Sequence, residues 1–133
     1  MATTGLVLDT SAYAAYRRGF ATAVEEIQLA EMILVPTIVL GELLAGFALG
    51  ARQEQNRLEL AGFLAQPRVK VLSAGQVTAE RYAVLLAYLR KIGKPIPTND
   101  LWIAAVTWEN GGALLTADSH FENIPQIVLH KIS

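Results

Sequence analysis

The chain contains no cysteine in its 133 residues. Disulfide bonds, thiolate metal ligands and a cysteine nucleophile are therefore excluded. There is also no apolar run of the roughly 18 to 20 residues that a membrane span needs. The longest candidate, Thr37–Leu49, is shorter and carries Glu42 near its middle. We expect no membrane segment, no signal peptide at the N-terminus, and a location in the reducing cytoplasm.

Net charge is also scarce. Eleven Lys and Arg residues face twelve Asp and Glu residues, a formal net charge of -1, which by itself gives no sign of a nucleic-acid partner. When four acids discussed below are set apart, the same eleven basic residues face eight acids, a balance of +3. A mildly basic body around an acidic pocket suits a phosphodiesterase that uses a metal ion. The hydrophobic fraction of 53% predicts a core plus an interface, and hence a homodimer.

Short apolar runs alternate with helical segments along the whole chain, a pattern typical of an α/β fold with a largely parallel sheet and helices on both faces. We predict one domain over residues 1–133, with four to five strands. Strands are expected at Gly5–Leu8, Met32–Val35, Val69–Leu72 and Ala113–Thr116, with a fifth candidate at Ile127–Leu129. Helices are expected from an N-cap at Ser11 to Arg18, at Ala21–Glu31, from Thr37 through Glu42, at Ala51–Gln66, at Gln76–Ile92, and at Leu101–Glu109 after a cap at Thr98 or Asn99.

Four acids lie at informative places in this pattern. Asp9 and Asp118 follow strands, where the crevice of an open α/β sheet binds ligands. Asp100 lies in the first turn of a helix and is the sole charge from Ile96 to Trp108. Glu42 is the only charge between Glu31 and Arg52, in a helix expected to be mostly buried. A buried carboxylate must be protonated, paired or bound to a cation, and neither helix offers a basic partner one turn away.

Each acid taken alone also fits a structural role, in a turn, near a helix dipole or on a polar edge. Taken together, four oxygen donors without cysteine or a histidine pair suit Mg²⁺ or Mn²⁺ rather than zinc. Such ions activate a bound water and shield a phosphate during phosphodiester cleavage. We therefore predict that Asp9, Glu42, Asp100 and Asp118 are catalytic residues and metal ligands.

Four segments in order resemble the motifs of PIN domains, and within that family the VapC-like toxins of prokaryotic toxin–antitoxin pairs. The segments are Leu6–Ser11, Pro36–Leu43, Ile96–Ala105 and Leu114–Phe121, followed by an ending that is similar from Ile124 to Leu129. The resemblance covers most of the chain. One departure is Ser119, which stands where the family often has a charged or larger polar residue, and which leaves the acids intact.

The resemblance implies a three-layer α/β/α sandwich and a metal-dependent endoribonuclease that cleaves RNA through an ion-activated water. It implies that the four acids form the metal cluster, and that Ser11, Asn99 and Thr116 support it through hydrogen bonds. It also implies a homodimer and a cognate antitoxin protein, a segment of which lies in a groove and can push an arginine into the acidic pocket.

Other residues receive weaker predictions. Backbone contacts with RNA are candidate roles for five basic residues: Arg17, Arg18, Arg90, Lys91 and Lys94. His120 is expected to be a hydrogen-bonded structural residue rather than a general base, and His130 is given no role. Trp102 and Trp108, at helical spacing, are expected in the core.

Two alternatives stay open. One is another carboxylate-using phosphoryl enzyme, a haloacid-dehalogenase-like phosphatase or a receiver domain, but Asp9-Thr10-Ser11 lacks the second aspartate of that phosphatase, and no acid pair precedes it as in a receiver. The other is a catalytically silent PIN-like module that binds RNA or a partner. The intact acid set favours the nuclease, because binding alone would not maintain four mutually repelling carboxylates.

Overall fold

The computed structural model describes residues 4–133. The prediction that the N-terminus opens no signal peptide falls largely on residues 1–3, outside the described part. The strands are β1 (Gly5–Leu8), β2 (Met32–Pro36), β3 (Val69–Leu72), β4 (Ala113–Thr116) and β5 (Val128–Lys131). The helices are α1 (Thr10–Arg17), α2 (Ala21–Leu29), α3 (Thr37–Leu49), α4 (Gln53–Leu64), α5 (Gln76–Lys91), α6 (Thr98–Glu109) and a short 3₁₀ helix, η1 (Ser119–Asn123).

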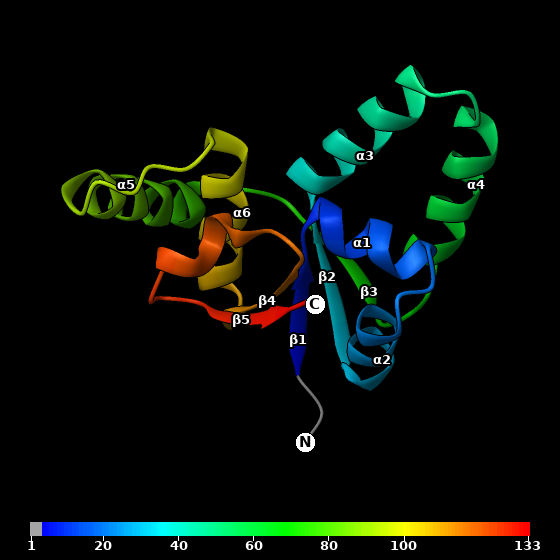
Figure 1. The fold of residues 1–133 in the computed structure, drawn as a ribbon, viewed down its shortest axis with the longest axis horizontal. Coiled ribbons are helices and arrows are strands. Elements are labelled where there is room, and N and C mark those ends of the chain that lie inside the picture. Colours follow the sequence, from blue (N-terminus) through cyan, green and yellow to red (C-terminus); the bar gives the residue numbers. More distant parts are fainter. Residues whose placement is uncertain (1–3) are drawn as a thin grey trace.

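The five strands form one parallel sheet in the order β3-β2-β1-β4-β5. Figure 1 shows α1, α2 and α4 on one side of the sheet and α5 and α6 on the other. This arrangement follows from right-handed crossovers, because the chain leaves β1 in one direction along the sheet and returns from β3 to β4 in the other. The predicted three-layer α/β/α fold with a parallel sheet is confirmed, including its fifth strand.

The central strands are buried on both faces. Leu6, Val7 and Leu8 in β1 and Leu114 and Leu115 in β4 are all 0% exposed. Continuous apolar runs are expected where helices cover both sides of a parallel sheet. The direction of the crossovers reverses between these two strands, so their carboxyl ends form the switch point where α/β sheets bind ligands.

Helix α3 differs from the expected buried helix. Only Val39 and Leu43 of its residues are buried, and Leu49 is 91% exposed. Figure 1 shows why: α3 rises beyond the end of the sheet, and α4 returns beside it. Leu58 in α4 is also largely exposed, at 69%. The apolar residues of α3 therefore contribute to the surface as well as to the core.

No helix within residues 4–133 is long and apolar enough to cross a membrane.

The N-terminal caps of two helices differ from the predictions. Helix α1 is capped by Asp9 rather than Ser11, because the Asp9 carboxylate accepts a hydrogen bond from the Ala12 amide at 2.8 Å. Helix α6 begins at Thr98 after Pro97, one turn earlier than expected, and it has no side-chain cap. Asn99 therefore lies inside the first turn, and its side chain is free to reach another element.

Candidate active site

One pocket of about 310 Å³ lies beyond the carboxyl ends of β1 and β4. Its lining includes all four acids predicted from the sequence: Asp9, Glu42, Asp100 and Asp118. Asp9 follows β1, Asp118 follows β4, Glu42 comes from the middle of α3, and Asp100 comes from the first turn of α6. Residues far apart in the sequence thus meet at the switch point of the sheet.

Asp9 is the most enclosed of the four acids, at 5% exposure. Its Oδ1 atom accepts hydrogen bonds from the Ser11 hydroxyl at 2.7 Å and the Ala12 amide at 2.8 Å. Its Oδ2 atom accepts one from the Thr116 hydroxyl at 2.5 Å. These donors fix the orientation of the carboxylate, and two of them come from Ser11 and Thr116, which were predicted to support the site.

Glu42 is held from two directions. The Thr10 hydroxyl donates to its Oε1 atom at 2.6 Å, and the Asn99 side-chain amide donates to its Oε2 atom at 2.7 Å. The three residues join α1, α3 and α6. Asn99 was predicted to support the site, whereas Thr10 was not singled out. The only sequence signal for Thr10 was its position directly after Asp9.

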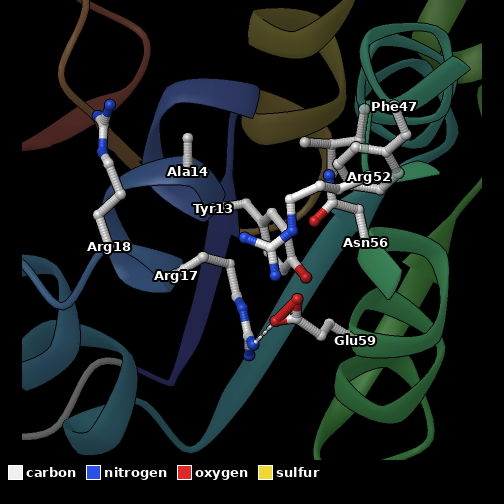
Figure 2. Close-up of a pocket in the computed structure, with 9 residues that line it drawn as sticks. Tyr13, Ala14, Arg17, Arg18, Phe47, Arg52, Asn56 and Glu59 are labelled. Atoms are coloured by element: carbon white, nitrogen blue, oxygen red, sulfur yellow. Dashed lines mark hydrogen bonds and ion pairs between the residues drawn. The ribbon is translucent and has the colours of Figure 1, made fainter. Parts of the chain in front are cut away.

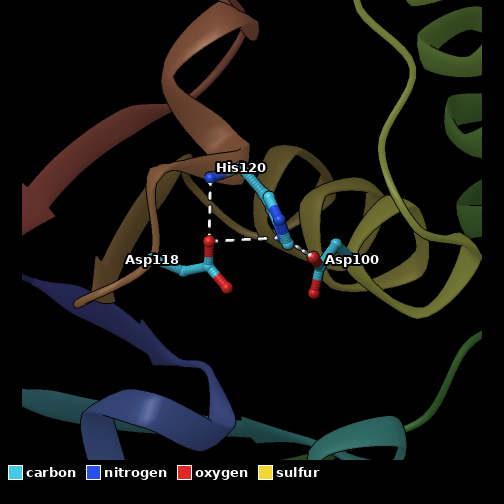
Figure 3. A group of neighbouring side chains, drawn as sticks. All are labelled: Asp100, Asp118 and His120. Carbon is cyan, nitrogen blue, oxygen red and sulfur yellow. Dashed lines mark hydrogen bonds and ion pairs between the residues drawn. The ribbon is translucent and has the colours of Figure 1, made fainter.

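Asp100, Asp118 and His120 form a compact group, in which one donor atom from each residue lies within 4.8 Å of the others. The His120 Nδ1 atom lies 2.6 Å from Asp100 Oδ2 and 3.2 Å from Asp118 Oδ1. The His120 amide also donates to Asp118 Oδ1 at 2.9 Å, which caps η1. Figure 3 shows the remaining oxygen of each aspartate pointing away from the imidazole.

His120 is hydrogen-bonded, as expected, but its partners are two of the site acids and its side chain is 46% exposed. It therefore belongs to the candidate site. The sequence signal for this role was the spacing Asp118-Ser119-His120 shortly after β4. With this spacing Asp118 caps η1, and the His120 ring lies against the Asp118 carboxylate. His130 was given no role. Its Nδ1 atom lies 3.1 Å from a carboxylate oxygen of Glu26, outside the acid pocket.

The surroundings of the site shift the pKa of Asp9, Asp100 and His120. Burial raises the pKa of Asp9, although hydrogen bonds from Thr116, Ser11 and Ala12 lower it in part. Burial likewise raises the pKa of Asp100, and the negative charges of Asp118 and Glu42 add to the effect. The hydrogen bond to Asp100 raises the pKa of His120. Burial is thus the main cause of the two aspartate shifts, and hydrogen bonding to a carboxylate is the main cause of the histidine shift.

The chemistry of this pocket fits a hard divalent cation. Its donors are carboxylate oxygens, and Mg²⁺ and Mn²⁺ prefer such ligands. The oxygens of Asp100 and Asp118 that turn away from His120 are available, while the carboxylates of Asp9 and Glu42 still have lone pairs beyond those used by their donors. The donor atoms of Asp100, Asp118 and His120 lie within 4.8 Å of one another. Asp9 and Glu42 complete the acidic lining of the pocket.

The other predicted residues lie elsewhere. Arg17 ends α1 and Arg18 follows it, whereas Arg90 and Lys91 end α5 and Lys94 comes three residues later. Figure 1 places these two helices on different sides of the sheet, so the five basic residues do not form one surface.

The two tryptophans are half-buried rather than central in the core. Trp102 stacks on Tyr82 with ring centroids 4.2 Å apart, and Trp108 lies under Arg81 at 4.5 Å. Both contacts join α5 to α6. The prediction of a core position is therefore only partly correct, because the two rings lie at the edge of the contact between α5 and α6.

Comparison with known proteins identifies the family of this chain. The family model described as the PIN domain matches residues 6–127, which include all four acids. The chain belongs to the PIN domain family, and its sequence is VapC-like. It is 30% identical to Ribonuclease VapC4 of Mycobacterium tuberculosis over 93 residues, 70% of this chain and 72% of that protein. It is 28% identical to Ribonuclease VapC5 of the same organism over 115 residues, 86% of this chain and 84% of that protein.

Solved structures agree with this membership. The chain is similar to one in the crystal structure of VapBC2 from Rickettsia felis bound to a promoter DNA fragment, with a TM-score of 0.86 and 25% identity over 98% of this chain and all of that one. A DNA-bound VapBC from Salmonella typhimurium gives a TM-score of 0.81 at 24% identity over the full length of both chains, a likeness of fold.

Proposed function

We propose that this protein is an Mg²⁺- or Mn²⁺-dependent endoribonuclease and the toxin of a VapBC-type toxin–antitoxin pair. The observation that carries the proposal is the single pocket lined by Asp9, Glu42, Asp100 and Asp118 at the switch point of the sheet. The names of the VapC4 and VapC5 relatives support ribonuclease activity. The VapBC structures support an antitoxin partner.

The acids have distinct parts in the proposed chemistry. Asp100 and Asp118 would bind the ion through the oxygens that His120 leaves free, and Asp9 and Glu42 would complete the negative surroundings. A bound divalent ion supplies Lewis acidity toward water and toward the phosphate group. Ser11, Thr116 and Asn99 hold the carboxylates in place, so little reorganisation is needed when a substrate arrives.

His120 has a separate part. Its Nδ1 atom contacts two carboxylates, and its ring is exposed at the mouth of the site. We assign it a positioning role, in which it holds the Asp100 and Asp118 side chains at a fixed separation. The hydrogen bond to Asp100 raises the pKa of the imidazole, and the charge of Asp118 adds to this, so the two acids favour a proton on the ring.

The proposed partners follow the same reasoning. The substrate is RNA, read in single-stranded or looped regions where bases are unstacked. The protein partner is a cognate antitoxin. A homodimer is proposed from the hydrophobic fraction of 53% and the exposed apolar residues of α3 and α4. The proposed location is the cytoplasm, where this substrate is found.

The experiment is cleavage of a looped RNA by purified, antitoxin-free protein with Mg²⁺, Mn²⁺ or EDTA. Cleavage is expected only with a divalent ion. Asp9→Asn, Glu42→Gln, Asp100→Asn and Asp118→Asn should each lower the rate sharply, because each removes negative charge with little change in shape. Their effects should be far from additive, since the acids act as one unit.

His120→Ala is the informative comparison and should be milder than Asp9→Asn when both proteins are folded. Equal losses would contradict the roles assigned to the two residues. Full activity in EDTA would overturn the metal mechanism. RNA binding without any cleavage would favour a silent binding module instead. Sequencing of RNA ends after expression of wild type and Asp9→Asn would then identify the RNA cleaved in cells.

A further inference from the structure

A second pocket, of about 360 Å³, lies between α1, α3 and α4. Its wall includes Tyr13 from α1 and Leu43 and Phe47 from α3, which provide apolar and aromatic surface. Ala14 lines both this pocket and the acid pocket, so the two are neighbours along α1. The volume falls within the range of about 300 to 1,000 Å³ that is usual for small-ligand sites. We call it the aromatic pocket.

The polar lining of the aromatic pocket is mainly basic. It contains Arg17, Arg18 and Arg52, and the only acid is Glu59, which is already paired with Arg17. In Figure 2 the Arg52 side chain lies beside the Tyr13 ring, Arg17 extends to Glu59, and Arg18 points away from both. This excess of positive charge lies directly beside a pocket of four acids. Such a pairing suits a polyanion whose backbone passes from the arginines to the metal site.

The pocket also offers hydrogen bonds for a polar ring. The Tyr13 side chain is 4% exposed, and its hydroxyl has no hydrogen-bond partner among residues 4–133. A buried polar group of this kind calls for a partner, which a bound ligand can supply. Asn56 adds an amide with both donors and an acceptor. Aromatic surface, an amide and an unpaired hydroxyl together are groups by which proteins hold unstacked bases of RNA.

From these contacts we infer that the aromatic pocket binds one unstacked nucleobase of the RNA, next to the phosphate placed at the acid pocket. The inference rests on the proposed ribonuclease function and adds to it a base-binding subsite. Arg52, exposed at the start of α4, binds the phosphate of that nucleotide. Phe47 packs against the base, and Asn56 contacts its edge.

The experiment is a thermodynamic cycle between protein and RNA variants. A short looped RNA is synthesised with an abasic nucleotide at each of three positions on either side of the cut, and kcat/KM is measured with Mn²⁺. Removal of the bound base should lower wild-type cleavage at one position by about 5- to 150-fold, the range for a base stacked on an aromatic side chain. Phe47→Ala should lower cleavage of the intact RNA similarly and show no further loss with that abasic RNA.

Two matched controls separate the pocket from general effects. Phe20→Ala removes an equally large ring that is 55% exposed at the start of α2, and it should retain the wild-type abasic profile. Arg57→Gln, on α4 but outside the aromatic pocket, is the control for Arg52→Gln. Asn56→Ala should change the preferred base at the same position, a result that loss of stability alone would not produce.

The outcomes distinguish the two proposals. If wild-type protein does not cleave RNA with any divalent ion, the proposed function fails. If it cleaves RNA but Phe47→Ala and Phe20→Ala have the same abasic profile and Asn56→Ala keeps the wild-type base preference, the base-binding subsite is refuted. In that second case the occupant of the aromatic pocket would be a protein segment. RNA would then not compete with the antitoxin for binding to this protein.

Discussion

Removing one charge from the acid pocket should stabilise the metal-free protein. The donor atoms of Asp100 and Asp118 lie no more than 4.8 Å apart. Two like charges at that distance repel by about 3.5 kcal/mol at an effective dielectric constant of 20 and by about 0.9 kcal/mol in bulk water. The side chains are 16% and 36% exposed, so the repulsion falls between these limits. Asp100→Asn removes this repulsion, and the amide oxygen of the new side chain can still accept a hydrogen bond from His120.

The same change should weaken the response to metal. A ligand that binds only the folded state stabilises it by about 2.7 kcal/mol at a hundredfold excess over its Kd. For a chain of this length that corresponds to a rise of about 10 °C in Tm. Wild type should show this rise with Mn²⁺. Asp100→Asn should melt about 3 to 12 °C higher than wild type without metal and gain much less when Mn²⁺ is added.

Scanning calorimetry at alkaline pH is the assay, because a proton on His120 would offset part of the repulsion. Glu25→Gln, an exposed acid on α2, is the control and should gain as much from Mn²⁺ as wild type. A metal-free Asp100→Asn protein that melts below wild type would refute the account of repulsion. Equal Mn²⁺ shifts in the two proteins would refute the metal site.

The folded-state pKa values of Asp9 and Asp100 lie above their ordinary value of 3.8, and that of His120 lies above 6.5, so the folded state binds more protons than the unfolded state. The free energy of unfolding of metal-free protein should therefore fall as pH rises through these folded-state pKa values. Urea denaturation measures this free energy, and a free energy that rises steadily with pH would contradict the prediction. Light scattering should give a homodimer at micromolar concentration, and a monomer there would remove the proposed interface while leaving the chemistry untouched.

Much of the fold could be predicted because its signals are local. A continuous apolar run such as Gly5–Leu8 is typical of a strand covered on both faces, and Gly and Pro mark where elements end. Burial of α3 could not be predicted in the same way. An apolar composition shows that a helix needs partners, but it does not show whether those partners lie in the same chain. Leu49 is 91% exposed, so the described part of this chain does not cover it.

The candidate site could be predicted only in part, for a related reason. The acids stand out because charge is rare around Glu42 and Asp100. Thr10 and His120 do not stand out, because their partners Glu42 and Asp100 lie 32 and 20 residues away in the sequence. The cap of α1 was assigned to Ser11 because serine is a common cap. The carboxylate of Asp9 takes that place and receives the Ser11 hydroxyl as a second donor.

The hydrogen bond between Thr116 and Asp9 joins residues 107 positions apart, and it forms where β4 inserts beside β1. Synthesis of the chain therefore delivers Asp9 and Glu42 well before the strand that completes their pocket, and Asp100 shortly before it. A ribosome translating this protein is exposed to a complete acid pocket only after Asp118 has emerged. The pocket on which the proposed nuclease depends is therefore incomplete for most of the chain's synthesis.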